Sequence, residues 1–144
     1  MRFRLPANVG LRATAPPGVF RGSAGDAILA AFAYRRAERL PRNRRELAAA
    51  RRRLVSATRK RGQSYKLRSV RTLRVDGGRA VELLGDQLIS NGRLRTRSLH
   101  VYKGRAEYVI ELSAVARDFP YLDRTVYRPL RSTLRLTGKV RSGR

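Results

Sequence analysis

The chain has 144 residues, of which 42% are hydrophobic, and its formal net charge is +24. This length fits one domain, and the hydrophobic fraction is sufficient for a folded core in spite of the charge. The absence of cysteine excludes disulfides and cysteine-based metal or redox chemistry. No apolar run approaches the ~20 residues that a membrane-spanning helix needs.

The first part of the chain predicts short strands that are broken by turns. Phe3 and Leu5 alternate with arginines before Pro6 interrupts the pattern. Residues 22–26, Gly-Ser-Ala-Gly-Asp, have the composition of a loop. The continuous apolar run 27–34 has the length of a strand and is bounded by glycine and arginines, so we expect a central strand there.

Residues 41–62 carry the strongest helix signals in the sequence. Asn43 can cap the N-terminus, Glu46 completes a capping-box pair, and Gly62 suits the position after the C-terminus. A narrow stripe at helical spacing predicts contact with a sheet and consists of Leu47, Ala50, Leu54, Ala57 and Thr58. Basic residues occupy the remaining surface, so we expect the arginines of this helix to point outward.

Residues 66–114 read as four consecutive strands, 66–75, 79–89, 94–102 and 105–114. Three turn signals separate them, Asp76-Gly77-Gly78, Asn91-Gly92 and Lys103-Gly104. We expect everything else in the chain to cover or extend the antiparallel sheet that these strands form.

The two later turns predict a register. With Asn91-Gly92 as the loop, Leu84 faces Leu99, Asp86 faces Arg97 and Glu82 faces Val101. With Lys103-Gly104 as the loop, Leu99 faces Tyr108 and His100 faces Glu107. One face then supplies a core of Leu84, Leu88, Leu99, Val101, Tyr108, Ile110 and Leu112. The opposite, more polar face carries Leu83, Gln87, Thr96, Ser98, His100, Glu107, Val109 and Glu111. We favour a structural ion pair for Asp86 and Arg97 over the floor of a ligand cleft.

A closing helix is predicted from Asp118, which is a plausible N-cap. Its apolar stripe consists of Phe119, Leu122, Val126, Leu130 and Thr133. Pro129 should kink this helix or force a fresh start at Arg128. We expect Leu134 and Leu136 to return to the core, which gives a single domain over residues 1–136 and a frayed basic tail over residues 137–144.

Three segments and the order of the elements resemble the PsbP-like superfamily, which includes an extrinsic photosystem II subunit, a Ran-binding release factor and bacterial domains. Phe3-Arg4-Leu5-Pro6 is similar to its opening strand followed by proline. Residues 79–82 (Arg-Ala-Val-Glu) follow a Gly-Gly turn, as in its usual strand. Residues 127–136 are similar to its closing helix and the extended segment after it.

The resemblance implies an α+β fold: an antiparallel six- to seven-stranded sheet with a long helix after the third strand and a C-terminal helix, arranged as an α/β/α sandwich. It also implies a domain that docks onto other molecules, because the superfamily has no shared catalytic residues to transfer to this chain. Many bacterial members lie beyond the membrane. The sequence leaves the compartment unknown: it is cytoplasmic as written, and extracytoplasmic if an N-terminal signal or anchor precedes it.

The residues themselves predict no catalytic, cofactor-binding or metal site, and no small-molecule substrate is evident. His100 is the only histidine, which disfavours a histidine-based metal site. Ser98, His100 and Glu107 could be imagined as a catalytic set, but two neighbours on one strand face and a cross-strand partner indicate ordinary pairing. The segment 22–25 lacks the Lys-Ser/Thr that a phosphate-binding loop needs.

Positive charge is concentrated around the predicted helix, since residues 35–74 contain sixteen basic residues against Glu38 and Glu46. The charge indicates an acidic partner (a protein surface, nucleic acid or anionic lipid), or it reflects the base composition of the genome. The candidate polyanion-binding residues are Arg44, Arg45, Arg52, Arg53, Arg59 and Lys60.

Two functional hypotheses follow. The first is a non-enzymatic docking domain that forms an accessory part of a larger membrane or envelope assembly. The alternative is a basic nucleic-acid-binding protein that uses the arginine-rich helix face, although the aromatic residues are too scattered to form stacking platforms.

Overall fold

The computed structural model describes residues 1–140, which form one seven-stranded antiparallel sheet in the order β1-β2-β3-β7-β6-β5-β4. The strands are β1 Gly10–Ala13, β2 Gly18–Ala24, β3 Ala27–Arg35, β4 Tyr65–Val75, β5 Gly78–Ile89, β6 Gly92–Lys103 and β7 Ala106–Val115. The helical elements are α1 Arg44–Arg59, α2 Phe119–Leu122, the π-helical segment η1 Asp123–Tyr127 and α3 Arg128–Thr133. The α+β fold, the helix after the third strand and the C-terminal helix are all confirmed.

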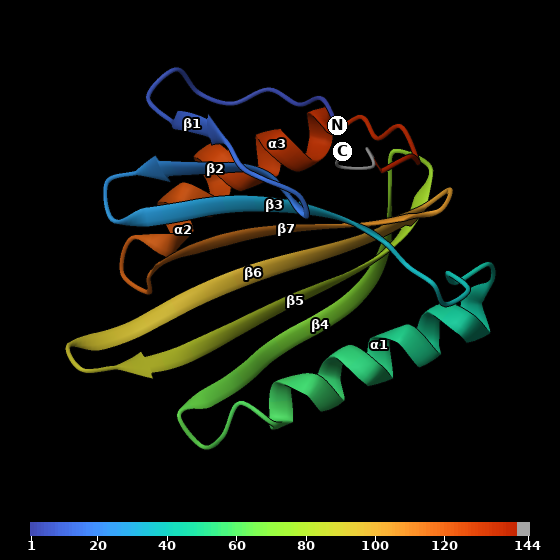
Figure 1. The fold of residues 1–144 in the computed structure, drawn as a ribbon. Coiled ribbons are helices and arrows are strands. Elements are labelled where there is room, and N and C mark those ends of the chain that lie inside the picture. The colour runs from blue at the N-terminus through green and yellow to red at the C-terminus, as the bar shows by residue number, and fades with distance from the viewer. Residues whose placement is uncertain (141–144) are drawn as a thin grey trace.

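Helices pack on both faces of the sheet, which confirms the α/β/α sandwich. One core lies between the sheet and the C-terminal helices, where Leu99, Ile110, Tyr127 and Leu130 are fully buried. A smaller core lies on the opposite face beneath α1 and contains Leu47, Ala50, Val81, Leu83 and Tyr102. Figure 1 shows α1 running beside β4, while α2 and α3 cross behind β2 and β3.

The four-strand meander is confirmed, but its predicted register is wrong by two residues. The loops are Ser90-Asn91 and Gly104-Arg105, each displaced by one residue from the prediction. Positive φ angles explain the displacement: Gly92 (φ 141) opens β6, and Gly104 (φ 61) takes the first loop position.

A slip of two residues leaves every side chain on its predicted face. Leu99 therefore stays in the core, although it faces Glu82 and Ile110, and His100 faces Val109. Asp86 faces Arg95, so the predicted Asp86–Arg97 pair is wrong. Leu88 lies beyond the end of the core and is 56% exposed.

A β-bulge at Leu67/Ser69 adapts β4 to the helix that covers it. Leu67 and Val70 are an odd number of residues apart and would point to opposite faces of a regular strand. The bulge places both on the side of α1, where they pack against Leu47 and Ala50.

Helix α1 is organised by the predicted cap. The Asn43 side chain accepts a hydrogen bond from the Glu46 N–H at 2.9 Å. The Glu46 carboxylate accepts from the Arg42 N–H at 2.6 Å instead of from Asn43, so the second half of the capping box is displaced by one residue. Leu47, Ala50 and Thr58 are buried as predicted, whereas Ala57 is exposed, because the helix is covered along a narrower line than its sequence stripe.

Two predictions for the N-terminal part need correction. Residues 22–24 belong to β2 and only Gly25 and Asp26 form the turn. Gly22 pairs with Leu11 of β1, whose side chain would lie 2.8 Å from a Cβ at this position, so the glycine serves close strand packing and does not mark a loop. The opening residues form an isolated bridge between Arg2 and Arg135 instead of a strand. The central strand predicted over residues 27–34 is confirmed as β3.

The closing segment starts afresh at Arg128, as Pro129 predicted. Pro129 has no N–H to donate, and the chain widens into a π-turn in which the Arg128 N–H bonds to the Asp123 carbonyl. Asp118 provides no side-chain cap, and its carboxylate accepts from Arg117 instead. Leu134 and Leu136 return to the core.

The beginning of the predicted tail is docked on the β6–β7 turn. The Arg105 N–H donates to the Gly138 carbonyl at 3.1 Å, and the Tyr108 hydroxyl donates to the Lys139 carbonyl at 3.1 Å. Val140 is partly buried against the core, so the expectation of fraying is wrong for residues 137–140, and its remainder over 141–144 lies outside the described residues.

Candidate functional site

Glu82 is the centre of a buried ion-pair network on the face of the C-terminal helices. Its side chain is 1% exposed and accepts hydrogen bonds from the Tyr127 hydroxyl at 2.6 Å and from Arg71 and Arg131 at 2.8 and 2.9 Å. Burial alone would raise the pKa of Glu82, but the hydrogen bonds from Tyr127 and Arg71 outweigh it and hold the pKa below its ordinary value. This carboxylate is therefore ionised, and its charge is compensated by donors within the protein.

Two further buried carboxylates are paired with arginines, and one of them, Asp123, shares Arg97 with Glu82. Asp86 accepts from Arg95 at 2.7 Å and from Arg68 at 3.1 Å, and the hydrogen bond from Arg95 lowers its pKa. Asp123 of the π-turn accepts from Arg97 at 2.7 Å and from Arg128 at 3.1 Å. The Asp123–Arg97 and Glu82–Arg131 pairs join the sheet to the C-terminal helices, whereas both partners of Asp86 lie on neighbouring strands. None of the three carboxylates is free to offset charge elsewhere.

Acidic side chains at the opposite end of the strands also pair with basic side chains of the protein. The Asp76 carboxylate accepts from Lys103 Nζ at 2.7 Å and from the Leu136 N–H at 2.7 Å, and the Lys103 bond lowers its pKa. Glu107 bonds to Arg36 and, at 2.9 Å, to His100 Nδ1. These contacts connect the β4–β5 turn, the β6–β7 turn and the C-terminal segment.

The candidate residues of α1 are all exposed, and none forms an ion pair within residues 1–140. Helical spacing divides them into three groups. Arg45, Arg52 and Arg59 recur every seven residues and form a row at intervals of about 10 Å, opposite the buried stripe. Arg44 lies on one flank, and Arg53 and Lys60 lie on the other.

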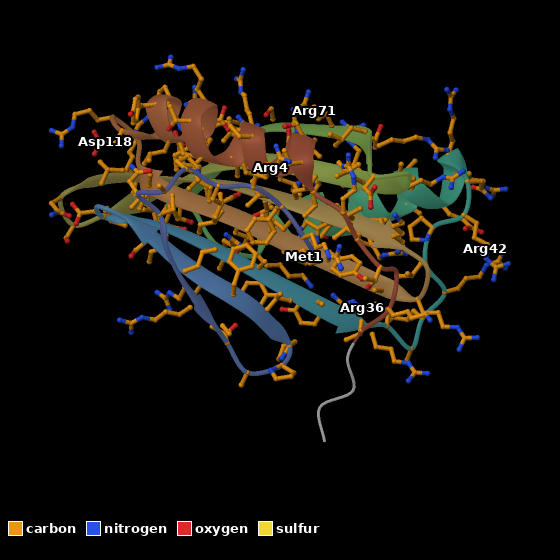
Figure 2. All side chains as sticks on the ribbon, turned by 90° about the horizontal axis from the view of Figure 1, so that it is seen from above. Met1, Arg4, Arg36, Arg42, Arg71 and Asp118 are labelled. Carbon is orange, nitrogen blue, oxygen red and sulfur yellow. The ribbon has the colours of Figure 1, made fainter. Side chains whose placement is uncertain are left out.

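A cleft of about 810 Å³ opens at the end of the sheet next to the N-terminus of α1. Its walls come from the β3–α1 loop and the β4–β5 and β6–β7 turns. The basic residues that line it are Arg35, Arg36, Arg39, Arg42, Arg79, Lys103 and Arg105, and its only acidic lining residue is Glu38. Figure 2 shows Arg36 and Arg42 at this end of the molecule and Asp118 at the opposite end.

Two hollows join this cleft to α1. A hollow of about 460 Å³ shares Arg36 and Tyr102 with the cleft and adds Arg53 and the apolar Leu54 from the helix. A hollow of about 350 Å³ shares Arg79 with the cleft and includes Arg44. Arg44 and Arg53 thus line hollows that adjoin the cleft, whereas Arg45, Arg52, Arg59 and Lys60 line neither the cleft nor these hollows.

Prediction from the helix alone missed the cleft residues Arg79 and Arg105. Each directly follows a glycine turn, and in a meander the turns after alternate strands lie at the same end of the sheet. Because the two arginines directly follow Gly78 and Gly104, the sequence could have been used to place both of them at the same end of the sheet.

The residues considered for catalysis are not assembled as a set. The Ser98 hydroxyl donates to Glu111 at 3.0 Å, while His100 bonds to Glu107. Within residues 1–140 no group of three His, Asp or Glu side chains is placed to hold a metal ion. In the same part of the chain, no helix has the length and apolar character required to cross a bilayer.

No protein-family model and no curated protein matches this sequence. Solved structures do match over most of the chain. CyanoP, the PsbP protein of the cyanobacterium Synechocystis sp. PCC 6803, has a TM-score of 0.61 at 12% identity and covers 88% of this chain and 83% of its own.

Two further structures match more closely in shape. LpqN, involved in cell envelope biogenesis of Mycobacterium tuberculosis, has a TM-score of 0.67 at 11% identity, covering 92% of this chain and 80% of its own. A Pseudomonas aeruginosa protein of unknown function, PA94, has a TM-score of 0.65 at 16% identity, covering 90% and 81%. The chain therefore has a PsbP-like fold.

Proposed function

We propose that this chain is a non-enzymatic docking domain that binds an acidic partner as an accessory part of a larger membrane or envelope assembly. The fold class supports the proposal, since one structural neighbour, LpqN, is described as involved in cell envelope biogenesis. Because fold does not fix function, the main argument comes from the charges of this chain.

The observation that carries the proposal is the separation of internal and external charge. Seven of the ten acidic residues form ion pairs. These are Glu46, Asp76, Glu82, Asp86, Glu107, Asp118 and Asp123. The α1 cations and several cleft cations have no such partner within residues 1–140. A protein that needs charge only for solubility could carry uncharged polar residues at most of these surface positions, so an exposed, uncompensated cluster of arginines favours binding of a negatively charged surface.

Co-purification tests this function directly. The tagged full chain is isolated from its own cells at low salt, treated with nuclease and eluted at high salt. We expect an acidic protein in stoichiometric amount, because exposed ion pairs are screened by salt. Elution of the chain alone, or of material that nuclease removes, would overturn the docking function.

Nucleic-acid binding is the second candidate, and the straight row of Arg45, Arg52 and Arg59 is the observation that favours it. A protein that neutralises several phosphates shows log K falling linearly and steeply with log[salt]. A fluorescent oligonucleotide titrated over a salt series measures this slope. A steep slope that the R45E/R52E/R59E variant abolishes would support this candidate, and undetectable binding at low salt would remove it.

A further inference from the structure

The cleft at the end of the sheet contains cations that have no ion-pair partner within residues 1–140. Of its seven basic lining residues, Arg36, Arg39 and Lys103 pair with Glu107, Glu46 and Asp76. The remaining four are Arg35, Arg42, Arg79 and Arg105, and they have no ion-pair partner within residues 1–140. The four guanidiniums come from three separate segments, so they can contact several points along one ligand.

The walls of this cleft are held in place by contacts that do not involve the side chains of those four arginines. Lys103 bonds to both the carbonyl and the carboxylate of Asp76, each at 2.7 Å, which joins the two turns. The backbone of Gly104 lies against that of Gly138, where an added Cβ would come within 2.4 Å of the Gly138 carbonyl oxygen. A cleft that is preorganised in this way loses little conformational freedom when a ligand binds.

One side of the cleft continues into a hollow with an apolar floor. Leu40, Pro41, Ala50 and Leu54 line this hollow, together with the ring of Tyr102. Arg36, Arg39 and Arg53 also line it, and Glu38 and Glu107 are its acidic lining residues. Arg36 is paired with Glu107 and Arg39 with Glu46, so Arg53 is the basic lining residue without an ion-pair partner within residues 1–140. A bulky apolar side chain can therefore be buried in the hollow, while the unpaired guanidiniums of the adjoining cleft bind the carboxylates beside it.

The combination of unpaired guanidiniums with an adjoining apolar hollow favours one class of acidic ligand over another. A nucleic acid would use the charges, but Tyr102 is the only aromatic residue in either lining and is 9% exposed, so the cleft offers no open stacking platform. A polypeptide supplies both carboxylates and apolar side chains on one extended backbone.

We propose that this cleft binds a linear acidic peptide segment in which carboxylates flank a bulky apolar residue. The inference rests on the proposed docking function and specifies its site and ligand class. The guanidiniums of Arg35, Arg42 and Arg105 bind the carboxylates, and the hollow between Leu40 and Leu54 receives the apolar side chain.

The test uses fluorescence anisotropy with three labelled probes. The first is a glutamate-rich peptide with one central leucine, the second has serine in place of the leucine, and the third is an oligothymidylate of the same charge. The full chain is compared with R35E/R42E/R105E and with a matched control, R12E/R21E/R93E, which makes the same charge change at exposed residues away from the cleft. Thermal unfolding establishes that each variant is folded.

We expect the leucine peptide to bind most tightly and R35E/R42E/R105E to weaken it by about tenfold or more, while the control changes binding by about twofold or less. Equal binding of the serine peptide, tighter binding of the oligothymidylate, or an equal loss in both variants would overturn the proposal. If the peptide fails but an acidic protein still co-purifies in a salt-sensitive manner, the docking function stands and the cleft is not its site. If both fail, the docking function itself is wrong.

Discussion

The hydroxyl of Tyr127 donates a hydrogen bond at 2.6 Å to Oε2 of Glu82, which joins the π-turn before α3 to the middle of β5. Both side chains are almost completely buried. The same carboxylate binds Arg71 from β4 and Arg131 from α3, so it connects the sheet edge to the C-terminal helix. A carboxylate in this position is stabilising only while its donors are present.

Removing the hydroxyl should therefore destabilise the fold. We expect Tyr127→Phe to lower the free energy of unfolding by about 1–3 kcal/mol, because a buried charged acceptor loses a donor. Urea denaturation measures the change. Tyr121→Phe is the control, since Tyr121 is 60% exposed, and it should change stability by less than about 0.5 kcal/mol. Equal effects of the two substitutions would contradict the role given to Glu82.

Acid should unfold the protein through its buried carboxylates. The hydrogen bond from Arg95 lowers the pKa of Asp86; burial opposes the lowering for Glu82 and Glu107, but their hydrogen bonds prevail. With a folded pKa below the unfolded one, the unfolded chain binds more protons, so stability rises with pH in this range. The stabilisation is present above the unfolded values of 3.8 for Asp and 4.5 for Glu, and it is lost as pH falls through the lower folded values.

Urea midpoints measured between acid and neutral pH check this prediction. Glu82→Gln should be less stable than the natural chain at neutral pH and should show a shallower decline on acidification. Stability that stays constant or increases as the pH is lowered would show that these carboxylates are not ionised in the folded state.

Two glycines have the same backbone conformation but different surroundings, so alanine substitutions at both distinguish the cost of backbone strain from the cost of a steric clash. Gly104 (φ 61) lies against Gly138, whereas Gly25 (φ 60) has open space around it. Alanine at either position is strained by about 1 kcal/mol, but Gly104→Ala should cost more, because the Cβ collides with the Gly138 carbonyl. Hydrogen exchange of the Arg105 amide, which donates to that carbonyl, should accelerate only in Gly104→Ala. Equal losses of stability would mean that the C-terminal segment is not docked there.

The cap of α1 gives a separate test of local structure. Asn43→Ala removes the acceptor of the Glu46 N–H and should lower the free energy of unfolding by about 1 kcal/mol. Ser56→Ala, at an exposed position within the same helix, should leave stability unchanged or slightly increase it. Circular dichroism during thermal unfolding distinguishes these outcomes, and a neutral Asn43→Ala would exclude this cap as the start of the helix.

Features encoded by neighbouring residues were predictable from the sequence. The cap of α1 involves residues three apart, and Pro129 acts on the turn that precedes it, so both predictions were confirmed. The meander was recognised from its glycine turns and alternating side chains. Its register was missed because a glycine can use a positive φ at several positions of a turn, and moving each loop by one residue moves every cross-strand partner by two.

Features that join distant segments could not be predicted. The partner of Asp86 depends on the register, and the bond between Tyr127 and Glu82 spans 45 residues. The cleft requires the β3–α1 loop and two turns to meet at one end of the sheet. The helix residues Arg44 and Arg53 were selected for their charge, and their place in the hollows that adjoin the cleft follows only from the packing of α1 on β4 and β5.

The most direct test of the docking function is the affinity of the purified co-isolated partner for three charge-matched variants, measured by calorimetry at two salt concentrations. The variants are R45E/R52E/R59E on the α1 row, R35E/R42E/R105E in the cleft and R12E/R21E/R93E on the remaining surface. We predict that the α1 or the cleft variant loses about tenfold or more in affinity at low salt, while the third variant retains it. Equal affinities for all three variants, or binding that does not weaken with salt, would contradict docking through these arginines.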